Sequence, residues 1–138
     1  MRRIEGFPLW IGTARDARDI KLVLDNGIEA IIDLALEERP VSPTRELIYL
    51  RFPLLDGTGN PEWLLRIALN ALEELMRSGV QTLVACGAGM SRSPALIAVA
   101  IAQFMDIEPT KALMSLSSEG SYDVSPGLWQ ELLATQTR

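Results

Sequence analysis

The sequence predicts an α/β protein with a central, mainly parallel sheet flanked by helices. Short, apolar, β-branched segments alternate along the chain with longer segments whose apolar residues recur at helical spacing. Strands that alternate with helices are typical of a parallel sheet covered by helices. The chain has 138 residues and shows neither a repeat nor a linker, so residues 1–138 are predicted to form a single domain.

The first third of the chain predicts two strands and a helix between them. Residues 8–12 read as a short strand, and residues 14–27 as a helix that ends at Gly27, a natural residue after a helix C-terminus. Residues 28–35 are apolar and β-branched, which is typical of a buried strand. Two prolines and mixed charge predict an exposed loop at 36–46.

The middle of the chain predicts another strand and a long helix. Residues 47–53 read as a strand, and residues 54–60 as a turn-rich loop. Asn60 is expected to cap the next helix, with Pro61 as its first residue, and Gly79 to end it.

The last part of the chain predicts a central strand and three helices. Residues 80–86 read as a strand, and residues 91–106 as a mostly buried helix. Two shorter helices are expected at 108–120 and 124–135.

The amino-acid composition argues against several classes of partner and indicates a cellular compartment. A net charge of −5 opposes general attraction to nucleic acid or to anionic membranes. The longest near-apolar run, residues 94–105, is too short to span a bilayer, and the N-terminus has no signal-peptide pattern. A lone cysteine cannot form an internal disulfide, so a reducing cytoplasm is expected. The chain has no histidine, which excludes a Cys–His zinc site, and no metal or cofactor is expected.

The stretch "VACGAGMSRSP" carries the chemistry that the sequence predicts. Cys86 ends a strand, and a glycine turn leads from it to the N-terminus of a buried helix at Arg92. Successive N–H groups in such a turn form an anion-binding nest, to which the helix dipole adds. The Arg92 guanidinium can bind two oxygens of a phosphate. The same positive surroundings lower the pKa of a thiol, so Cys86 is expected to be a nucleophile placed for attack on phosphorus.

An inert, buried cysteine is the alternative for Cys86 taken alone, since free cysteines are often buried. It does not explain why Gly87, Gly89, Ser91, Arg92 and Ser93 follow it at this spacing. The stretch also lacks the lysine of a P-loop and the third glycine of a dinucleotide-binding turn.

The same stretch resembles the Cys-x5-Arg signature of protein tyrosine phosphatases, and most closely that of the dual-specificity phosphatases. The likeness extends to "PLWIGTARDARDIKLVLDNGIEAIIDLA", "YLRFPLLD" and "VSPGLWQELL", and so over almost the whole chain. The resemblance implies a phosphatase domain in which Cys86 forms a cysteinyl-phosphate and Ser93 helps the sulfur to leave. It also implies a phosphate-binding loop, made of Gly87, Ala88, Gly89, Met90, Ser91 and Arg92.

The family also has an aspartate about thirty positions before its cysteine, and Asp56 lies there. An independent argument leads to the same residue. Dephosphorylation needs an acid for the leaving oxygen and a base for water, and without histidine a carboxyl group is the obvious choice. Asp56 is the only aspartate between Asp33 and Asp106. The alternative, a turn-forming Asp-Gly pair, would be preferred only if Cys86 and its loop were absent.

Two positions depart from the family pattern. Ala85 stands where the family has a histidine, which predicts a less acidic thiol. Asp33 stands where the family often has an asparagine. Its charge would oppose thiolate and phosphate if it approached the site, and would not if a backbone N–H held it away.

The predicted function is a metal-independent cysteine phosphatase acting on phosphotyrosine, phosphoserine and phosphothreonine, with a phosphorylated protein or peptide as substrate. Two alternatives remain. One is a pseudophosphatase that binds phosphoproteins without turnover, and the other is an enzyme acting on a small non-protein phosphate ester.

Overall fold

A computed structural model describes residues 1–118 and 120–136, and within them the strands form one five-stranded sheet of order β1-β2-β5-β3-β4. The strands are β1 (Arg2–Ile4), β2 (Leu9–Thr13), β3 (Ala30–Ala35), β4 (Ile48–Leu54) and β5 (Thr82–Cys86). β1 pairs antiparallel with β2, and every other pair is parallel. The predicted α/β class with a mainly parallel sheet is therefore confirmed.

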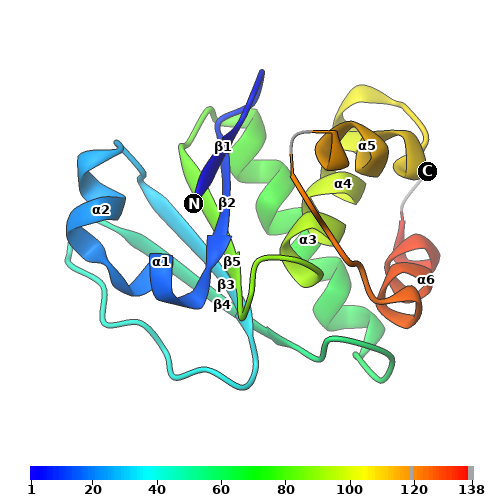
Figure 1. Cartoon of the computed structure of the whole chain (residues 1–138), viewed down its shortest axis with the longest axis horizontal. Coiled ribbons are helices and arrows are strands. Elements are labelled where there is room, and N and C mark those ends of the chain that lie inside the picture. Colours follow the sequence, from blue (N-terminus) through cyan, green and yellow to red (C-terminus); the bar gives the residue numbers. More distant parts are fainter. Residues whose placement is uncertain (119, 137–138) are drawn as a thin grey trace.

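Helices cover both faces of this sheet (Figure 1). They are α1 (Ala14–Arg18), α2 (Ile20–Asp25), α3 (Glu62–Arg77), α4 (Arg92–Met105), α5 (Pro109–Ser117) and α6 (Pro126–Thr135). In Figure 1, α1 and α2 lie on one side of the sheet, and α3 to α6 lie together on the other.

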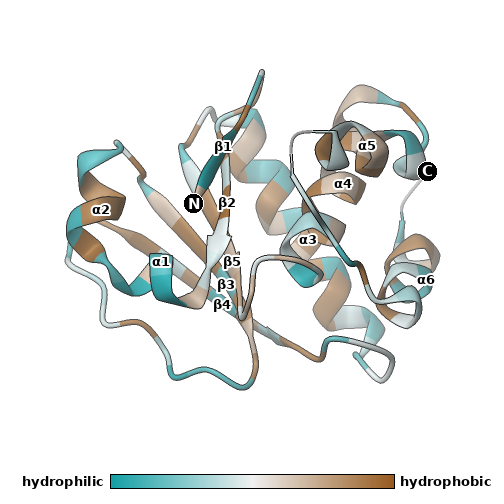
Figure 2. Ribbon diagram, in the orientation of Figure 1, coloured by the Kyte–Doolittle hydropathy of each residue, from teal (hydrophilic) through white to brown (hydrophobic). Residues whose placement is uncertain are grey.

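Two hydrophobic clusters correspond to the two faces, and apolar residues gather where helices meet the sheet (Figure 2). Because side chains alternate along a strand, successive residues of β5 enter different clusters. Val84 and Cys86 belong to the larger cluster, which includes α4, whereas Leu83 and Ala85 belong to the smaller one beside α1 and α2. Cys86 therefore lies on the α4 face, and Ala85 on the opposite face.

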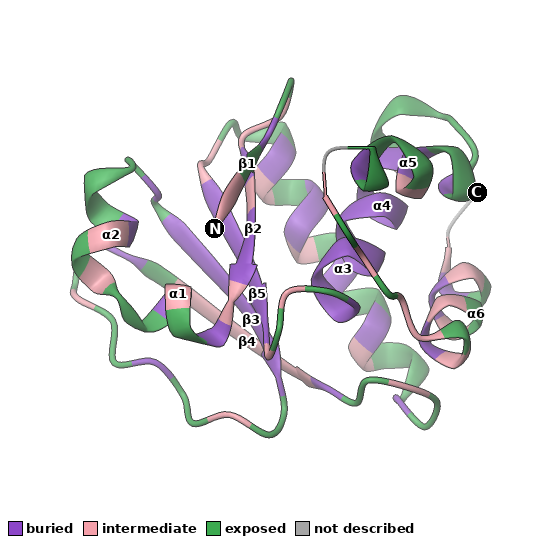
Figure 3. Cartoon of the chain, in the orientation of Figure 1, coloured by how far each residue is buried: buried purple, intermediate pink, exposed green. Residues whose placement is uncertain are grey.

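Helix α4 lies at the centre of the larger layer, and most of it is buried (Figure 3). Every residue from Arg92 to Ala102 is buried, because α4 packs against α3, α5, α6 and the sheet. A helix that is apolar all round is stable only when it is enclosed in this way. The arrangement forces the one charged residue of the buried run, Arg92, into the interior.

The N-terminal third differs from the prediction in two respects. β1 was not expected, and the single helix expected at 14–27 is divided in two. Asp19 has a non-helical backbone (φ −84°, ψ 80°), and its carboxylate accepts a hydrogen bond from the N–H of Leu22. An aspartate side chain that bonds the backbone locally competes with helix propagation, and here it starts α2.

The expected cap of the long helix was also wrong, because α3 begins at Glu62 with Pro61 before it and no side-chain cap. Asn60 precedes a proline, a position that disfavours helical backbone. Its side chain instead accepts from the N–H of Leu55 (2.8 Å) and donates to the carbonyls of Leu55 (3.0 Å) and Gly57 (3.2 Å). Asn60 thus fixes the turn that contains Asp56.

The longest helix of the described residues, α3, has 16 residues. In the part of the chain that the structure describes, no helix combines the length and the apolar character needed to cross a bilayer.

The buried position of α4 gives a first test. Leu96 is fully buried in the larger cluster, so Leu96→Ala is expected to lower the free energy of unfolding by about 3 kcal/mol. Met114 is 73% exposed, so Met114→Ala is a matched control expected to change it by less than about 0.5 kcal/mol. Urea unfolding measures both, and equal effects would contradict the placement of α4.

Candidate active site

The carboxyl ends of three parallel strands bring the candidate residues together. β5 ends at Cys86, which is 2% exposed, and the loop after it leads into α4 at Arg92. The loop after β3 carries Glu37, and the loop after β4 carries Asp56. Ligands of open α/β sheets bind at this edge, where the strands end.

The loop from Gly87 to Ser91 is tied to its surroundings at both ends. The N–H of Ala14 donates to the carbonyl of Gly87 (3.4 Å), and the N–H of Asp123 donates to the carbonyl of Met90 (2.8 Å). Gly89 has φ +70°, and a Cβ there would lie 2.9 Å from the carbonyl oxygen of Gly12. The loop therefore needs glycine at this position to pass β2 closely.

The backbone N–H groups of this loop are left free. Among the described residues, the N–H groups of Ala88, Gly89, Met90 and Ser91 make no hydrogen bond, although carbonyls of the same loop do. Consecutive unpaired N–H groups beside a helix N-terminus form a site for an anion. That residues 87–91 bind phosphate stays a prediction.

Arg92 is 5% exposed, and its hydrogen bonds are distributed unevenly over the guanidinium. Nη1 donates to Glu37 Oε1 (2.6 Å) and to the carbonyl of Leu54 (3.0 Å), and Nη2 donates to Glu37 Oε2 (2.6 Å). Each terminal nitrogen carries two N–H groups and Nε carries one. Nη1 is therefore fully used, whereas one N–H of Nη2 and the N–H of Nε remain.

The unused N–H groups of Arg92 lie on one edge of the guanidinium. Nε is buried and has no partner among the described residues. A buried donor without an acceptor is costly, so this edge is built for an acceptor from outside the chain. The adjacent Nε and Nη2 groups fit two oxygens of a phosphate.

Glu37 and Arg92 form an ion pair beside the loop. The hydrogen bond from Arg92 lowers the pKa of Glu37 to about 2, against some opposition from burial. The same bond raises the pKa of Arg92. A Cβ on Gly87 would lie 2.6 Å from Glu37 Oε2, so the carboxylate rests directly against the start of the loop.

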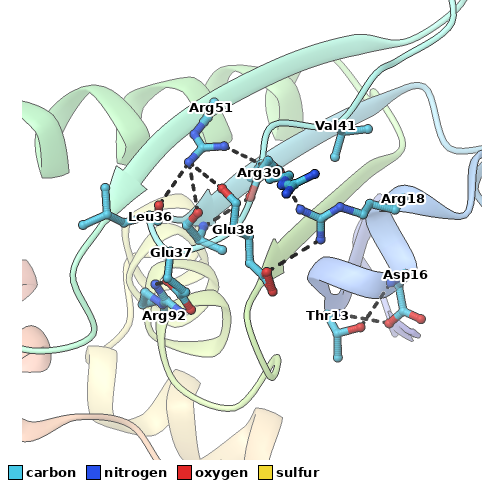
Figure 4. Close-up of polar contacts among 12 residues, drawn as sticks. Thr13, Asp16, Arg18, Leu36, Glu37, Glu38, Arg39, Val41, Arg51 and Arg92 are labelled. Carbon is cyan, nitrogen blue, oxygen red and sulfur yellow. Dashed lines mark hydrogen bonds and ion pairs between the residues drawn. The ribbon is translucent and has the colours of Figure 1, made fainter.

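Arg51 holds the segment that carries Glu37 (Figure 4). Its Nη2, with one N–H shared between two acceptors, donates to the carbonyls of Ala35 (3.2 Å), Leu36 (3.2 Å) and Glu38 (2.9 Å) in this turn. On the other side of the segment, Arg18 donates to the carbonyl of Arg39 (2.6 Å). The turn has no strand partner there, and arginine side chains satisfy its carbonyls instead.

The structure decides between the two alternatives for Asp33. Its Oδ1 accepts from the N–H of Ala35 (3.2 Å), and its Oδ2 accepts from the hydroxyl of Tyr49 (2.6 Å). Arg51 Nη1 lies 3.9 Å from the same Oδ2. Asp33 is thus held by a backbone N–H, and its charge supports the turn rather than facing the loop at 87–91.

Asp56 is exposed and is tied to the loop through Ser91. The Ser91 hydroxyl donates to Asp56 Oδ1 (2.5 Å) and accepts from the N–H of Ser125 (2.9 Å). Together with the Asn60 bonds, this holds Asp56 beside the candidate anion site. The structure therefore brings Asp56 to the loop that begins at Cys86, as the sequence predicted.

Ser93 is fully buried, and its Oγ has no partner among the described residues. The hydrogen bond to the Cys86 sulfur that the resemblance implies is not formed in this structure. In the described part of the chain, no group of three metal-ligating side chains is arranged to hold an ion.

No protein-family model matches the chain, and a search of curated proteins also found no match. Solved structures do match over nearly its whole length. Human DUSP28 is 23% identical with a TM-score of 0.80, over 94% of this chain and 91% of that one. A mouse putative dual-specificity phosphatase complexed with zinc tungstate is 25% identical with a TM-score of 0.79, over 94% and 82%.

The chain has the dual-specificity phosphatase fold. This confirms the resemblance drawn from the sequence. The same fold also matches human tyrosine phosphatase-like serine/threonine/tyrosine-interacting protein, at 19% identity and a TM-score of 0.76, over 92% of this chain and 89% of that one. Whether a chain with the dual-specificity phosphatase fold turns over substrate therefore depends on its site.

Within this dual-specificity phosphatase fold, the sequence reasoning missed Glu37 and Arg51. Residues 36–46 were expected to be an exposed loop, and the side chain of Glu37 is 56% exposed. The available signal was indirect. A buried arginine at a helix N-terminus needs a negative partner from elsewhere, and the loops after β3 and β4 both bring carboxylates to that edge.

The Glu37–Arg92 pair predicts a pH-dependent stability. Because the pKa of Glu37 is lowered from 4.5 to about 2, the pair contributes fully above pH 4.5 and is lost as the pH falls toward 2. Solvent screening of the exposed carboxylate limits this contribution to about 1 kcal/mol. Glu37→Gln is expected to be less stable than wild type at pH 7, with the difference shrinking at pH 3. A difference in unfolding free energy that is constant with pH would contradict this.

The Arg51 contacts give a second test. Arg51→Ala leaves the carbonyls of the turn without their donor and is expected to cost about 1–2 kcal/mol of unfolding free energy. Hydrogen exchange at the N–H of Val41, which donates to Tyr49 Oη, should become faster. The control is Arg66→Ala, which removes an exposed pair with Glu62 and should cost less than about 0.5 kcal/mol. Equal effects of the two changes would exclude a special role for Arg51.

Proposed function

We propose that the chain is a metal-independent cysteine phosphatase that hydrolyses phosphate monoesters through a cysteinyl-phosphate. One observation carries this proposal: the N–H groups of the loop and the Nε edge of Arg92 have no acceptor among the described residues, and both belong to the segment that begins at Cys86. A tetrahedral dianion supplies acceptors for both sets of donors. We infer that an anion held by both sets of donors presents its phosphorus to the sulfur of Cys86.

In the first step, the Cys86 thiolate attacks phosphorus and the bond to the ester oxygen breaks. Asp56 gives its proton to the leaving oxygen, so that an alcohol or phenol departs. The N–H groups of Gly87, Ala88, Gly89, Met90 and Ser91 and the fork of Arg92 hold the phosphoryl oxygens. These donors are fixed in advance, so they stabilise the transition state without reorganisation.

In the second step, water attacks the phosphorus of the cysteinyl-phosphate and Asp56 takes its proton. The sulfur–phosphorus bond breaks, which releases inorganic phosphate and the thiolate. Ser93 then donates its buried hydroxyl, which has no partner in the resting structure, to the departing sulfur.

Ser91 positions Asp56 for both steps. Its oxygen accepts from Ser125 and still has a lone pair, so the hydroxyl can donate to the ionised carboxylate or accept from the protonated one. Asp56 can thus change its protonation state without leaving its position.

The proposed substrates are phosphotyrosine, phosphoserine and phosphothreonine in a protein or peptide. The free positions of the loop carry no basic residue, and the net charge is −5, which disfavours nucleic acid and anionic lipid surfaces. We propose that the activity is cytoplasmic, because a chain with a single cysteine forms no internal disulfide and a reducing compartment keeps a free thiol reduced.

A phosphoprotein-binding module without turnover is the second candidate. Ala85 in place of histidine favours it, as does the match to a phosphatase-like interacting protein. A small non-protein phosphate ester as substrate is a third candidate. Cys86, Arg92 and Asp56 together favour the enzyme.

The deciding experiment is hydrolysis of p-nitrophenyl phosphate and phenyl phosphate from pH 5 to 8 with EDTA. Cys86→Ser is expected to abolish turnover. Asp56→Asn should lower kcat by about a hundredfold or more and remove the basic limb of the pH profile. Because phenol is the poorer leaving group, the loss in Asp56→Asn should be larger with phenyl phosphate.

A binding control separates an inactive preparation from a binding module. Tungstate is expected to raise the melting temperature of wild type and of Cys86→Ser, since the loop donors remain. No turnover by wild type, with this shift intact, would replace the enzyme by the binding module. No shift and no turnover would reject the anion site itself.

A further inference from the structure

A polar cavity lies at the far end of α4 from Arg92 and shares no residue with the candidate active site. Its volume is about 950 Å³, in the range of small-molecule sites. It is formed by one face of α3, the C-terminal end of α4 and the start of α5, with Gln136 at its edge.

Glu73 is the buried group of this cavity. It projects from α3, is 7% exposed, and makes no hydrogen bond or ion pair among the described residues. The nearest candidate partner, Arg77, is bound to Glu74 instead (2.9 Å). Burial accordingly raises the pKa of Glu73, and Arg77 opposes this only in part. Its carboxylate oxygens keep access to solvent in the cavity and have no partner among the described residues. A partly desolvated carboxylate without a partner is less favourable than one in water.

Two donors line the same cavity without an acceptor. Gln103 projects from α4, and its Nε2 is buried with no hydrogen-bond partner. Lys111 on α5 is exposed, lines the same cavity and makes no hydrogen bond or ion pair in the described part of the chain. The cavity thus combines an unpaired carboxylate with an unpaired amide donor and an unpaired ammonium, each from a different helix.

We propose that this cavity binds a small zwitterion of the amino-acid class. Its cationic nitrogen binds the Glu73 carboxylate, and its own carboxylate is directed toward Gln103 and Lys111. Both charges of such a ligand are then met by opposite charges or donors that the chain leaves unused. Glu73, Asp106 and Glu108 line the cavity and oppose a simple anion. A simple cation would leave the buried Nε2 of Gln103 without an acceptor.

The alternative is that Glu73 and Gln103 pair with each other or with water and serve only the fold. The two accounts differ in what Glu73→Gln does to the free protein. If Glu73 is reserved for a ligand, removing its charge relieves a cost, and the melting temperature without ligand should stay the same or rise. If Glu73 is a structural partner of Gln103, the melting temperature should fall.

The test uses L-arginine and agmatine as probes, at about 10 mM, with thermal melting and isothermal titration calorimetry. Agmatine keeps the guanidinium and lacks the carboxylate. Wild type is expected to bind L-arginine more tightly than agmatine. Glu73→Gln should lower the affinity for L-arginine about tenfold or more. Lys111→Gln should lower the affinity for L-arginine but leave the affinity for agmatine unchanged.

The matched control is Glu62→Gln on the same helix, which removes an exposed carboxylate outside the cavity and should leave binding unchanged. The proposal is overturned if neither probe binds wild type, or if L-arginine binds Glu73→Gln as well as wild type. It does not depend on the phosphatase proposal, because binding is measured without a phosphate ester. The Cys86→Ser variant is therefore expected to bind L-arginine normally.

Discussion

The buried guanidinium of Arg92 is the constraint on which the rest of the site depends. A charge in the interior must be paired, and the pairing must leave one edge of the group free if it is to bind an anion. Glu37 and the carbonyl of Leu54 meet both requirements. They accept from both N–H groups of Nη1 and from one N–H group of Nη2, so the second N–H of Nη2 and the N–H of Nε stay free for an anion. The carboxylate fixes the plane of the guanidinium, and the remaining N–H groups are directed away from it.

This pairing explains why so many side chains serve the loops at one edge of the sheet. Parallel strands end together, so three loops without ladder partners meet at that edge. Their backbone groups are satisfied by side chains, Arg51 after β3 and Asn60 after β4. The Arg51 bonds hold the turn that carries the Glu37 carboxylate, and the Asn60 bonds hold the turn that carries the Asp56 carboxylate. The rigidity of the site therefore comes from side-chain to backbone bonds more than from the sheet itself.

The sequence predicted the parts of this arrangement that are local. Cys86, its glycine turn and Arg92 are contiguous, so their order along the chain already implies a strand, a nest and a helix N-terminus. Asp56 was found by elimination, because the chain offered no other aspartate in that region. Glu37 and Arg51 could not be assigned in this way. Their partners lie 55 and 13 to 16 positions away, and no short-range pattern records which carboxylate reaches a buried arginine.

The charge balance at the site follows from the same geometry. Arg92 is already paired with the Glu37 carboxylate, and Asp56 beside the loop brings no positive charge. The loop contributes no lysine, so the positive surroundings of a bound dianion come mainly from N–H dipoles and from one edge of a guanidinium. Such donors act over short distances and demand the right oxygen positions, whereas a net charge of −5 gives an anion no long-range attraction. If the loop binds a phosphoryl group as proposed, recognition depends on the tetrahedral fit of that group, and an anion of different shape gains little from its charge alone.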